Sequence, residues 1–193
     1  SNNNVLYLNS ANSTLNGGGG IYVVNSSNIL ANNTLYDNSA TTRGGGVYTS
    51  NGTNTFINNI LWNNKKGTSA NVAGADYFAA NTNGNTFKNN LLQLAIGNYS
   101  VSNIGSYAIG ATASNNIFAQ APLFVNNGDI DGTDNIHRTA DDGLRLNCAS
   151  PAYNRATATD APTTDIIGTT RPQFGVVDMG AYESVNNLNL IVS

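Results

Sequence analysis

Apolar and polar residues alternate along several short stretches of the chain, with a period of two. The alternation covers residues 5–8, 20–24, 47–49 and 55–61. A period of two places successive side chains on opposite faces of an extended strand, whereas helical side chains return to one face about every 3.6 residues. The pattern therefore predicts short strands that are separated by turns, and no long helix.

An asparagine pair followed by apolar residues recurs along the chain. Its first asparagine stands at positions 3, 32, 58, 89 and 115, so successive copies are 29, 26, 31 and 26 residues apart. A Gly-Gly-Gly-apolar-Tyr unit at 18–22 recurs at 44–48, and a two-residue marker precedes four of the pairs, at 29–30, 55–56, 86–87 and 112–113. Repeats of about 20 to 50 residues are typical of solenoids, in which each circuit stacks on the next.

A circuit of this length accommodates about three short strands and three turns. Stacking would place Leu6, Leu35, Leu61, Leu92 and Phe118 in one interior apolar column, and the asparagine amides would form a ladder. The pattern resembles the right-handed parallel β-helix family, including surface proteins and autotransporter-like adhesins. The resemblance covers about residues 1–125. It implies an all-β, pectin-lyase-like fold, a right-handed single-stranded parallel β-helix of about four to five coils.

Side chains that follow the interior column point away from it, because neighbours in a strand alternate. Tyr7, Tyr36 and Trp62 would form an outward aromatic column, which either stacks on sugar rings or is buried under a loop. The longer spacing after Trp62 contains residues 65–71, which we interpret as an inserted loop. Loops on solenoids often carry binding sites. The candidate ligand-binding residues are Tyr36, Trp62, Lys65 and Lys66.

Composition limits the possible partners. Charged residues make up 10% of the 193 residues, the net charge is -3, and there is no basic run. Nucleic acid and anionic membranes are therefore poor partners. No apolar stretch approaches the roughly 20 residues of a membrane span. Cys148 is the only cysteine, so neither an intrachain disulfide nor a cysteine-based metal site is expected.

Five of the eleven acidic residues lie between positions 129 and 142. Residues 129–134 read Asp-x-Asp-Gly-x-Asp, and alternating carboxylates with a glycine turn suit Ca²⁺ in a structural role. Closely spaced carboxylates also repel one another unless they are neutralised. The alternative is a solvated acidic loop, since the complete EF-hand pattern is absent. The candidate metal ligands are Asp129, Asp131, Asp134, Asp141 and Asp142.

The composition changes near residue 120, where the repeats end. The later chain contains, in order, Pro122-Leu123-Phe124, Gly143-Leu144-Arg145-Leu146, Ser150-Pro151-Ala152, Arg171-Pro172 and Val177-Asp178-Met179-Gly180-Ala181-Tyr182-Glu183. This series resembles the end segment of bacterial β-helix proteins of the choice-of-anchor (type Q) family, although Gly168 falls two residues early and Ile166-Ile167 replaces a polar turn. The resemblance implies a segment that closes the helix, and export from a bacterium such as a member of the Bacteroidota.

The predicted organisation is a set of coils over residues 1–119, a closing segment over 120–184 and a linker over 185–193 toward an anchor or sorting domain. Because residue 1 lies inside a coil, we expect further coils upstream in a longer protein. No catalytic residues are predicted. His137 is the only histidine and has no flanking nucleophile motif, and the carboxylates Asp37 and Asp76 lie far apart in the repeat.

The sequence therefore predicts a non-catalytic adhesin or extended structural β-helix, on the outer cell surface or secreted. Its expected partners are extracellular polysaccharides or surface glycans. The alternative is the C-terminal part of a polysaccharide lyase or glycoside hydrolase whose active coils lie mostly outside this chain.

Overall fold

The computed structural model describes residues 2–15, 17–80, 84–94 and 114–185, and these contain no helix. The first coil comprises β1 (Val5–Tyr7), β2 (Ser10–Ala11), β3 (Ile21–Val24) and β4 (Ile29–Ala31). The second comprises β5 (Thr34–Tyr36), β6 (Ser39–Ala40), β7 (Val47–Ser50) and β8 (Thr55–Ile57). The third comprises β9 (Ile60–Trp62), β10 (Lys65–Lys66), β11 (Tyr77–Ala79) and β12 (Thr86–Lys88), and β13 (Leu91–Leu92) and β14 (Ile117–Phe118) follow.

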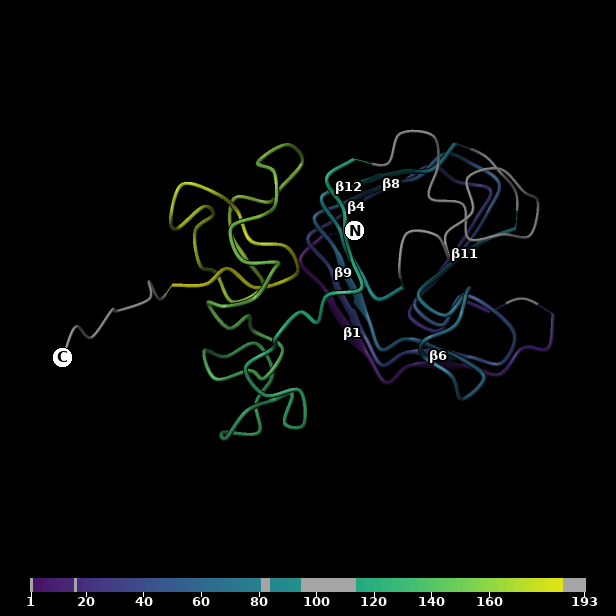
Figure 1. Ribbon diagram of the computed structural model, residues 1–193, viewed down its shortest axis with the longest axis horizontal. Helices are drawn as coiled ribbons and strands as arrows, with labels where there is room; N and C mark the ends of the chain where they lie inside the picture. Colours follow the sequence, from purple (N-terminus) through teal and green to yellow (C-terminus); the bar gives the residue numbers. More distant parts are fainter. Residues whose placement is uncertain (1, 16, 81–83, 95–113, 186–193) are drawn as a thin grey trace.

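All strands pair in parallel with the corresponding strand of the adjacent coil. One sheet has the order β1-β5-β9-β13-β14, and the other three are β2-β6-β10, β3-β7-β11 and β4-β8-β12. The result is a right-handed parallel β-helix of about four turns, which confirms the predicted fold (Figure 1). The predicted interior column is confirmed by the register, which aligns Leu6, Leu35, Leu61, Leu92 and Phe118 in that order.

Each of the first three coils has four strands, so the prediction of three was wrong. The additional strands β2, β6 and β10 have two residues each, too few for an alternating pattern to be visible in the sequence. The bend before them is fixed by stacked asparagines. Nδ2 of Asn9 donates to Oδ1 of Asn38 at 2.8 Å, and Nδ2 of Asn38 donates to Oδ1 of Asn64 at 3.0 Å.

The inserted loop also begins later than predicted. Lys65 and Lys66 pair with Ser39 and Ala40 as β10, so irregular chain starts only at Gly67. Strand pairing uses the backbone, and lysine side chains can point to solvent from such a strand. The prediction that residues 65–71 are all loop was therefore wrong at its first two positions.

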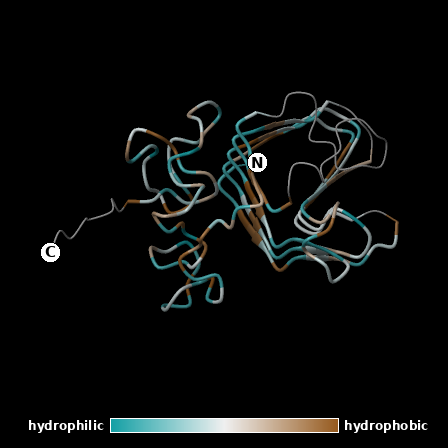
Figure 2. Cartoon of the chain, viewed as in Figure 1, coloured by the Kyte–Doolittle hydropathy of each residue, from teal (hydrophilic) through white to brown (hydrophobic). Residues whose placement is uncertain are grey.

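The coil interior is filled by aliphatic and aromatic side chains that stack from coil to coil. The rings of Phe56 and Phe87 are stacked with centroids 4.5 Å apart, and both side chains are fully buried. Leu30 lies in register with Phe56 on the other side. Hydrophobic residues follow the strands and hydrophilic residues occupy many of the bends (Figure 2). A single circuit could not bury this surface alone, so stacking is what stabilises the coils.

The second asparagine of each pair forms the predicted ladder. The backbone nitrogen and Nδ2 of Asn33 both donate to Oδ1 of Asn59 at 2.9 Å. Asn59 repeats this pattern with Oδ1 of Asn90, at 2.9 and 3.0 Å. These three side chains are almost completely buried, so each rung satisfies polar atoms that would otherwise be costly to bury.

The glycine units lie where neighbouring backbones approach each other closely. A Cβ on Gly45 would stand 2.1 Å from the carbonyl oxygen of Lys65, and a Cβ on Gly46 would stand 2.4 Å from that of Asp76. No side chain fits at such distances, which explains the glycines. The register of Tyr22 with Tyr48 confirms that both glycine units occupy the same place in successive coils.

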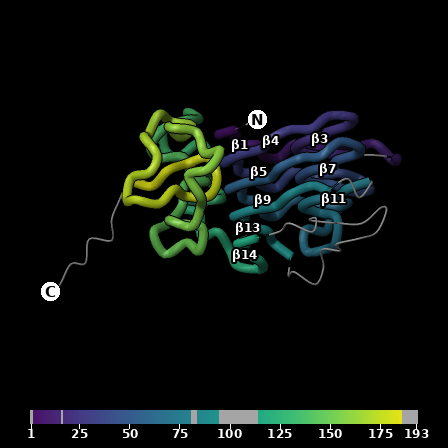
Figure 3. The backbone as a smooth tube through the Cα atoms, turned by 90° about the horizontal axis from the view of Figure 1, so that it is seen from above, coloured from purple at the N-terminus to yellow at the C-terminus, as the bar shows by residue number. Residues whose placement is uncertain are grey.

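Residues 120–184 pack against the outer face of the five-stranded sheet (Figures 1 and 3). We call them the closing segment. In place of extended strands, they contain turns and two antiparallel bridges, Phe124 with Leu146 and Thr164 with Thr170. The closing segment therefore cannot rely on strand ladders and needs other contacts.

A buried ion pair organises the closing segment. Nη1 of Arg171 donates to Oε2 of Glu183 at 2.9 Å, and each side chain is 1% exposed. Nη2 of Arg171 donates to the carbonyl oxygen of Gly180 at 2.9 Å. Glu183 also accepts the backbone N–H groups of Gln173 and Asp178, both at 3.0 Å. The pair is thus surrounded by further hydrogen bonds, which a buried charge requires.

Candidate functional site

The first asparagine of four of the five pairs binds the main chain of the closing segment. Asn58 exchanges two hydrogen bonds with Thr157. Its Nδ2 donates to the Thr157 carbonyl oxygen at 2.8 Å, and its Oδ1 accepts the Thr157 N–H at 2.9 Å. The first asparagines of three other pairs also donate to main-chain carbonyl oxygens of the closing segment. Asn3 donates to Thr164, and Asn89 donates to Arg155 at 3.1 Å. Asn32 donates to Asp178 at 3.0 Å and to Gly180 at 3.3 Å.

A shared backbone conformation presents these amides in the same direction. The φ angles of Asn3, Asn32, Asn58, Asn89 and Asn115 lie between 51° and 59°. This left-handed region is one that asparagine tolerates better than most residues. We call these five residues the outer asparagine column. Its members share a role because they share both a position in the coil and a backbone angle.

Asn115 is the column member without a partner in the closing segment. It lies one coil beyond Asn89, since Leu91 pairs with Ile117 in the same sheet. Its side chain is exposed and makes no hydrogen bond to another described residue. It lines a cleft between the end of the helix and the closing segment. This amide is thus available to a ligand.

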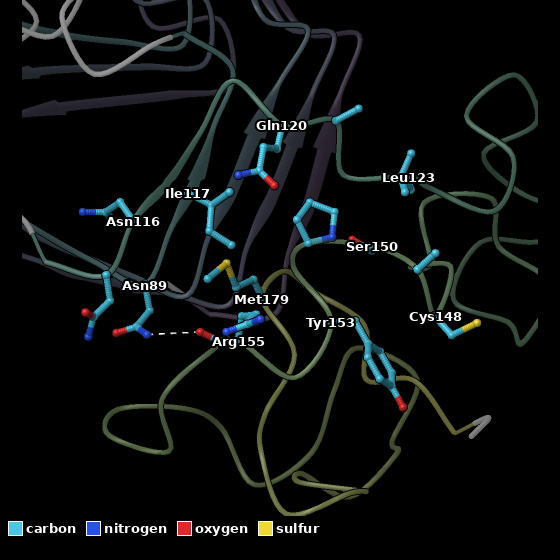
Figure 4. A pocket seen from close by; sticks show the side chains of 14 residues that line it. Asn89, Asn116, Ile117, Gln120, Leu123, Cys148, Ser150, Tyr153, Arg155 and Met179 are labelled. Atoms are coloured by element: carbon cyan, nitrogen blue, oxygen red, sulfur yellow. Dashed lines mark hydrogen bonds between the residues drawn. The ribbon is translucent and has the colours of Figure 1, made fainter. Parts of the chain in front are cut away.

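The cleft has a volume of about 1040 Å³ (Figure 4). One wall comes from the last coils and includes Ile117 and Gln120, and the other comes from the closing segment and includes Tyr153, Arg155 and Met179. Met179 is almost fully buried, and its N–H donates to the carbonyl of Ala152 at 3.1 Å. Both walls are therefore anchored in ordered structure.

The chemistry of the cleft is that of amides, one cation and one phenol. Asn89, Asn115, Asn116 and Gln120 supply carboxamides, which both donate and accept hydrogen bonds. The guanidinium of Arg155 is not in an ion pair within the described part of the chain. The described lining residues include no Asp, Glu or His. The lining therefore suits binding of a polar or anionic ligand and does not supply an acid–base pair.

The predicted aromatic column lies beneath the closing segment. Tyr36 is 7% exposed, packs with Leu144 and Tyr182, and its hydroxyl accepts a hydrogen bond from Asn127 at 3.0 Å. Trp62 is partly buried against the same segment. Of the two outcomes that the sequence left open for this column, the structure shows burial. Little of the Tyr36 ring remains for a sugar, and binding by Trp62 stays a prediction.

The two predicted ligand lysines lie away from the cleft. Lys65 forms an ion pair with Asp37, and Lys66 is exposed. Neither lines the cleft beside Arg155. The register places Tyr36 beside Trp62, and Lys65 bonds the residue that follows Tyr36. Ligand binding by the four candidate residues stays a prediction.

Part of the acidic loop converges on a hydroxyl group. Oγ1 of Thr139 lies 2.7 Å from Asp141, 3.2 Å from Asp142 and 3.5 Å from Asp134. The hydroxyls of Thr139 and Thr133 hold the pKa of the Asp141 carboxyl well below its usual range. Asp142 also accepts the hydroxyl of Tyr182 at 2.6 Å.

These carboxylates are bonded to donors of the chain itself. Among the described residues, no three His, Cys, Asp or Glu side chains are grouped to hold a metal ion. The hydrogen bonds of the Thr139 hydroxyl involve Asp134, Asp141 and Asp142, and not Asp129 or Asp131, the first two predicted ligands. Ca²⁺ binding at the five aspartates stays a prediction.

The other titratable groups contribute to structure. His137 Nε2 lies 3.0 Å from the hydroxyl of Tyr7, a contact between the loop and the first coil. Burial raises the pKa of the Glu183 carboxyl and of the Asp178 carboxyl. Burial also raises the pKa of Tyr77 to about 12. None of these groups lines the cleft, and their contacts support the fold.

Sequence reasoning missed a second aromatic column. On the outer face of the β3-β7-β11 sheet, Tyr22 stacks on Tyr48 at 5.0 Å and Tyr48 stacks on Phe78 at 5.8 Å. The guanidinium of Arg43 lies 4.8 Å from the centre of the Phe78 ring. The sequence did contain a signal for this column. Residues 74–78 are a diverged third copy of the glycine unit, in which Gly74 is retained and Phe78 takes the place of the tyrosine.

The sequence comparisons add no family. No protein-family model matches the chain, and no curated protein matches it either. No helix of the described chain is both long enough and apolar enough to cross a membrane. The functional argument therefore rests on the residues of the cleft.

Proposed function

We propose that this chain is a non-catalytic, adhesin-type β-helix that binds glycans in the cleft. The observation that carries the proposal is the lining, in which four carboxamides, Arg155 and Tyr153 face a volume of about 1040 Å³. Sugar hydroxyls are both donors and acceptors, and carboxamides match them in both roles. Binding sites of this kind are concave and have a small number of placed polar groups.

Two of these groups are held in position by contacts that do not involve a ligand. Asn116 ends the inner ladder. Its Oδ1 accepts the backbone N–H and the Nδ2 of Asn90, and its Nδ2 donates to the carbonyl of Phe87 at 2.9 Å. The main chain of Arg155 is held by Asn89. These contacts fix the backbone of both walls before a ligand binds, so less conformational freedom is lost on binding, which favours affinity.

The resemblance of the closing segment to the type Q proteins supports an extracellular or outer-surface location in a bacterium. In this role the coils act as a rigid spacer, and the cleft beside the last strand presents a ligand site. Stacked coils suit the role because their length can grow without a change in the core.

Binding and turnover separate this proposal from the rival lyase or hydrolase function. The chain should be incubated with immobilised neutral and acidic polysaccharides, and the supernatant assayed for unsaturated and reducing-end products. We expect retention on at least one glycan without product, and loss of retention when Arg155→Gln and Gln120→Ala are combined. Lys66→Gln, outside the cleft, is the matched control. Release of product from a retained glycan would contradict the non-catalytic proposal.

We also propose that the acidic loop binds Ca²⁺ as a structural ion. Three of its carboxylates already meet at Thr139, and bound Ca²⁺ would neutralise their mutual repulsion. Ca²⁺ should then raise the melting temperature relative to chelator, because an ion that binds only the folded state stabilises it. Mg²⁺ at the same concentration is the control. An identical melting temperature with Ca²⁺ and with chelator would remove the site.

A further inference from the structure

Members of the outer asparagine column bind main-chain carbonyls in the same way, and one member, Asn115, has no such partner. Four of its members donate to carbonyl oxygens of secondary amides in the closing segment. Asn115 has the same backbone angle, with φ of 54° against 52° for Asn89. Adjacent parallel strands are about 4.8 Å apart, so its amide stands one rung beyond a donor that is already bonded. The ligand that this rung fits is therefore another amide carbonyl.

The surroundings of this rung add two requirements. Ile117 lines the cleft, is only partly buried and packs on the apolar cluster that contains Met179, so an apolar group can lie against Ile117. Arg155 lies in the same wall as Met179, and its main-chain carbonyl is bonded to Asn89 (Figure 4). A guanidinium recognises a carboxylate or sulfate through paired N–H donors. A ligand that is complementary to this cleft therefore carries an amide carbonyl, a small apolar group and an anionic group.

We infer that the cleft binds a glycan that carries both N-acyl groups and carboxylates, with Asn115 bonded to the acyl carbonyl and Arg155 to the carboxylate. The acyl methyl group packs on Ile117. Tyr153 contributes an aromatic ring at the edge of the cleft. This inference rests on the proposed function, because it names the class of glycan that the same cleft takes.

The probes are chosen by which of the two groups, N-acetyl and carboxylate, they carry. Hyaluronan oligosaccharides carry both N-acetyl groups and carboxylates, chito-oligosaccharides carry N-acetyl groups alone, oligogalacturonides carry carboxylates alone, and cello-oligosaccharides carry neither. Affinity is measured by titration calorimetry at low and moderate salt. We expect the order both, then either one, then neither, and we expect salt to weaken binding of the two acidic probes most.

Variants assign each group to its partner. Asn115→Gly removes the amide and keeps the left-handed backbone angle, and Asn115→Asp keeps the shape and removes the donor. Each should weaken the two N-acetylated probes about tenfold, as expected for one lost hydrogen bond. Asn115→Gly should leave oligogalacturonide unchanged, whereas the added charge of Asn115→Asp should weaken it. Arg155→Gln should weaken the two acidic probes and leave chito-oligosaccharide unchanged. The matched control is Asn135→Gly, since Asn135 is exposed, has φ of 54° and lies outside the cleft.

The possible results distinguish a failure of this inference from a failure of the proposed glycan binding. Equal affinity for cello-oligosaccharide and hyaluronan, or unchanged N-acetyl binding by both Asn115 variants, would overturn the inference and leave glycan binding in place. Binding of none of the glycans would overturn both. Binding of an extended peptide in their place would also overturn the inference, and it would assign the open rung to a main-chain carbonyl like those bound by the other four asparagines.

Discussion

In the coils, a buried polar side chain is bonded to the same residue type one coil away, as in the run Asn33, Asn59 and Asn90. In the closing segment, each buried polar group has a different partner, as Arg171 has in Glu183, Gly180 and Asn3. A repeated contact can be copied along the chain, whereas a unique network depends on every member. We therefore expect the coils to tolerate local change and the closing segment to fail as a unit.

Trp62 provides a probe for this comparison. It is the only tryptophan, and it packs against the closing segment from β9. Its fluorescence should therefore report release of the closing segment, and far-ultraviolet circular dichroism should report the strands of the coils. With one probe for each region, the unfolding of the coils and of the closing segment can be followed separately.

The largest expected effect comes from the buried ion pair. Arg171→Ala leaves Glu183 charged and without its cation, and removing one partner of a buried pair costs about 3–5 kcal/mol. The urea midpoint of the Trp62 signal should fall strongly, and the dichroism midpoint should move much less. Arg138→Ala is the control, because Arg138 is an exposed residue of the same segment. A variant that kept the wild-type Trp62 midpoint would contradict the role of the pair.

A core truncation should affect the other region. Leu61 is fully buried between Leu35 and Leu92, and Leu→Ala changes in cores cost about 2–5 kcal/mol. Because the closing segment packs on the same coils, Leu61→Ala should lower both midpoints together. Leu15→Ala, at a side chain that is 75% exposed, should change neither. A fall in the dichroism midpoint alone would show that the coils do not support the closing segment.

The smallest expected effect is the pH dependence. Burial raises the pKa of Asp178 and Glu183, so the folded closing segment binds protons more readily than the unfolded one. Its stability should then fall as pH rises from the unfolded values near about 4 through the folded ones. Asp141 acts in the opposite direction, since its pKa is lowered and its contribution is lost at lower pH.

Urea titrations of the Trp62 signal across pH 3.5 to 7 are the corresponding measurement. We expect the midpoint to decrease toward neutral pH, and the decrease to be smaller in Asp178→Asn, which removes one of the two titrating groups. The dichroism midpoint serves as the internal reference. A fluorescence midpoint that rises steadily with pH would contradict the assignment.

The repeats explain why the coils were predictable and the closing segment was not. Spacing in the sequence placed Leu6 beside Leu35 and Asn33 beside Asn59, since equal positions in successive circuits must stack. The contact of Asn58 with Thr157 spans 99 residues and is not repeated with any spacing, so no pattern pointed to it. The cleft depends on such contacts. Asn115 was visible as one member of a repeat, but its partnerless state was not.

In the closing segment, the sequence alone could not distinguish residues that stabilise the fold from residues that bind a ligand. The acidic residues between positions 129 and 142 suggested a metal site, and in the fold Asp134, Asp141 and Asp142 lie within 3.5 Å of the Thr139 hydroxyl, while Asp142 also accepts the hydroxyl of Tyr182. The final Val-Asp-Met-Gly-Ala-Tyr-Glu stretch supplies Glu183 of the buried ion pair and the two backbone carbonyls that Asn32 binds.

The most direct test of this account is the loss of one outer asparagine. Asn58→Gly removes both bonds to Thr157 and keeps the left-handed angle, and each buried bond lost costs about 1–3 kcal/mol. Asn51→Gly, at an exposed position with φ of 57°, is the control. In a urea titration followed by both signals, Asn58→Gly should lower the Trp62 midpoint while the dichroism midpoint stays near that of the control. Midpoints that fall together, or a Trp62 midpoint equal to that of the control, would contradict a closing segment held to the coils by side-chain amides.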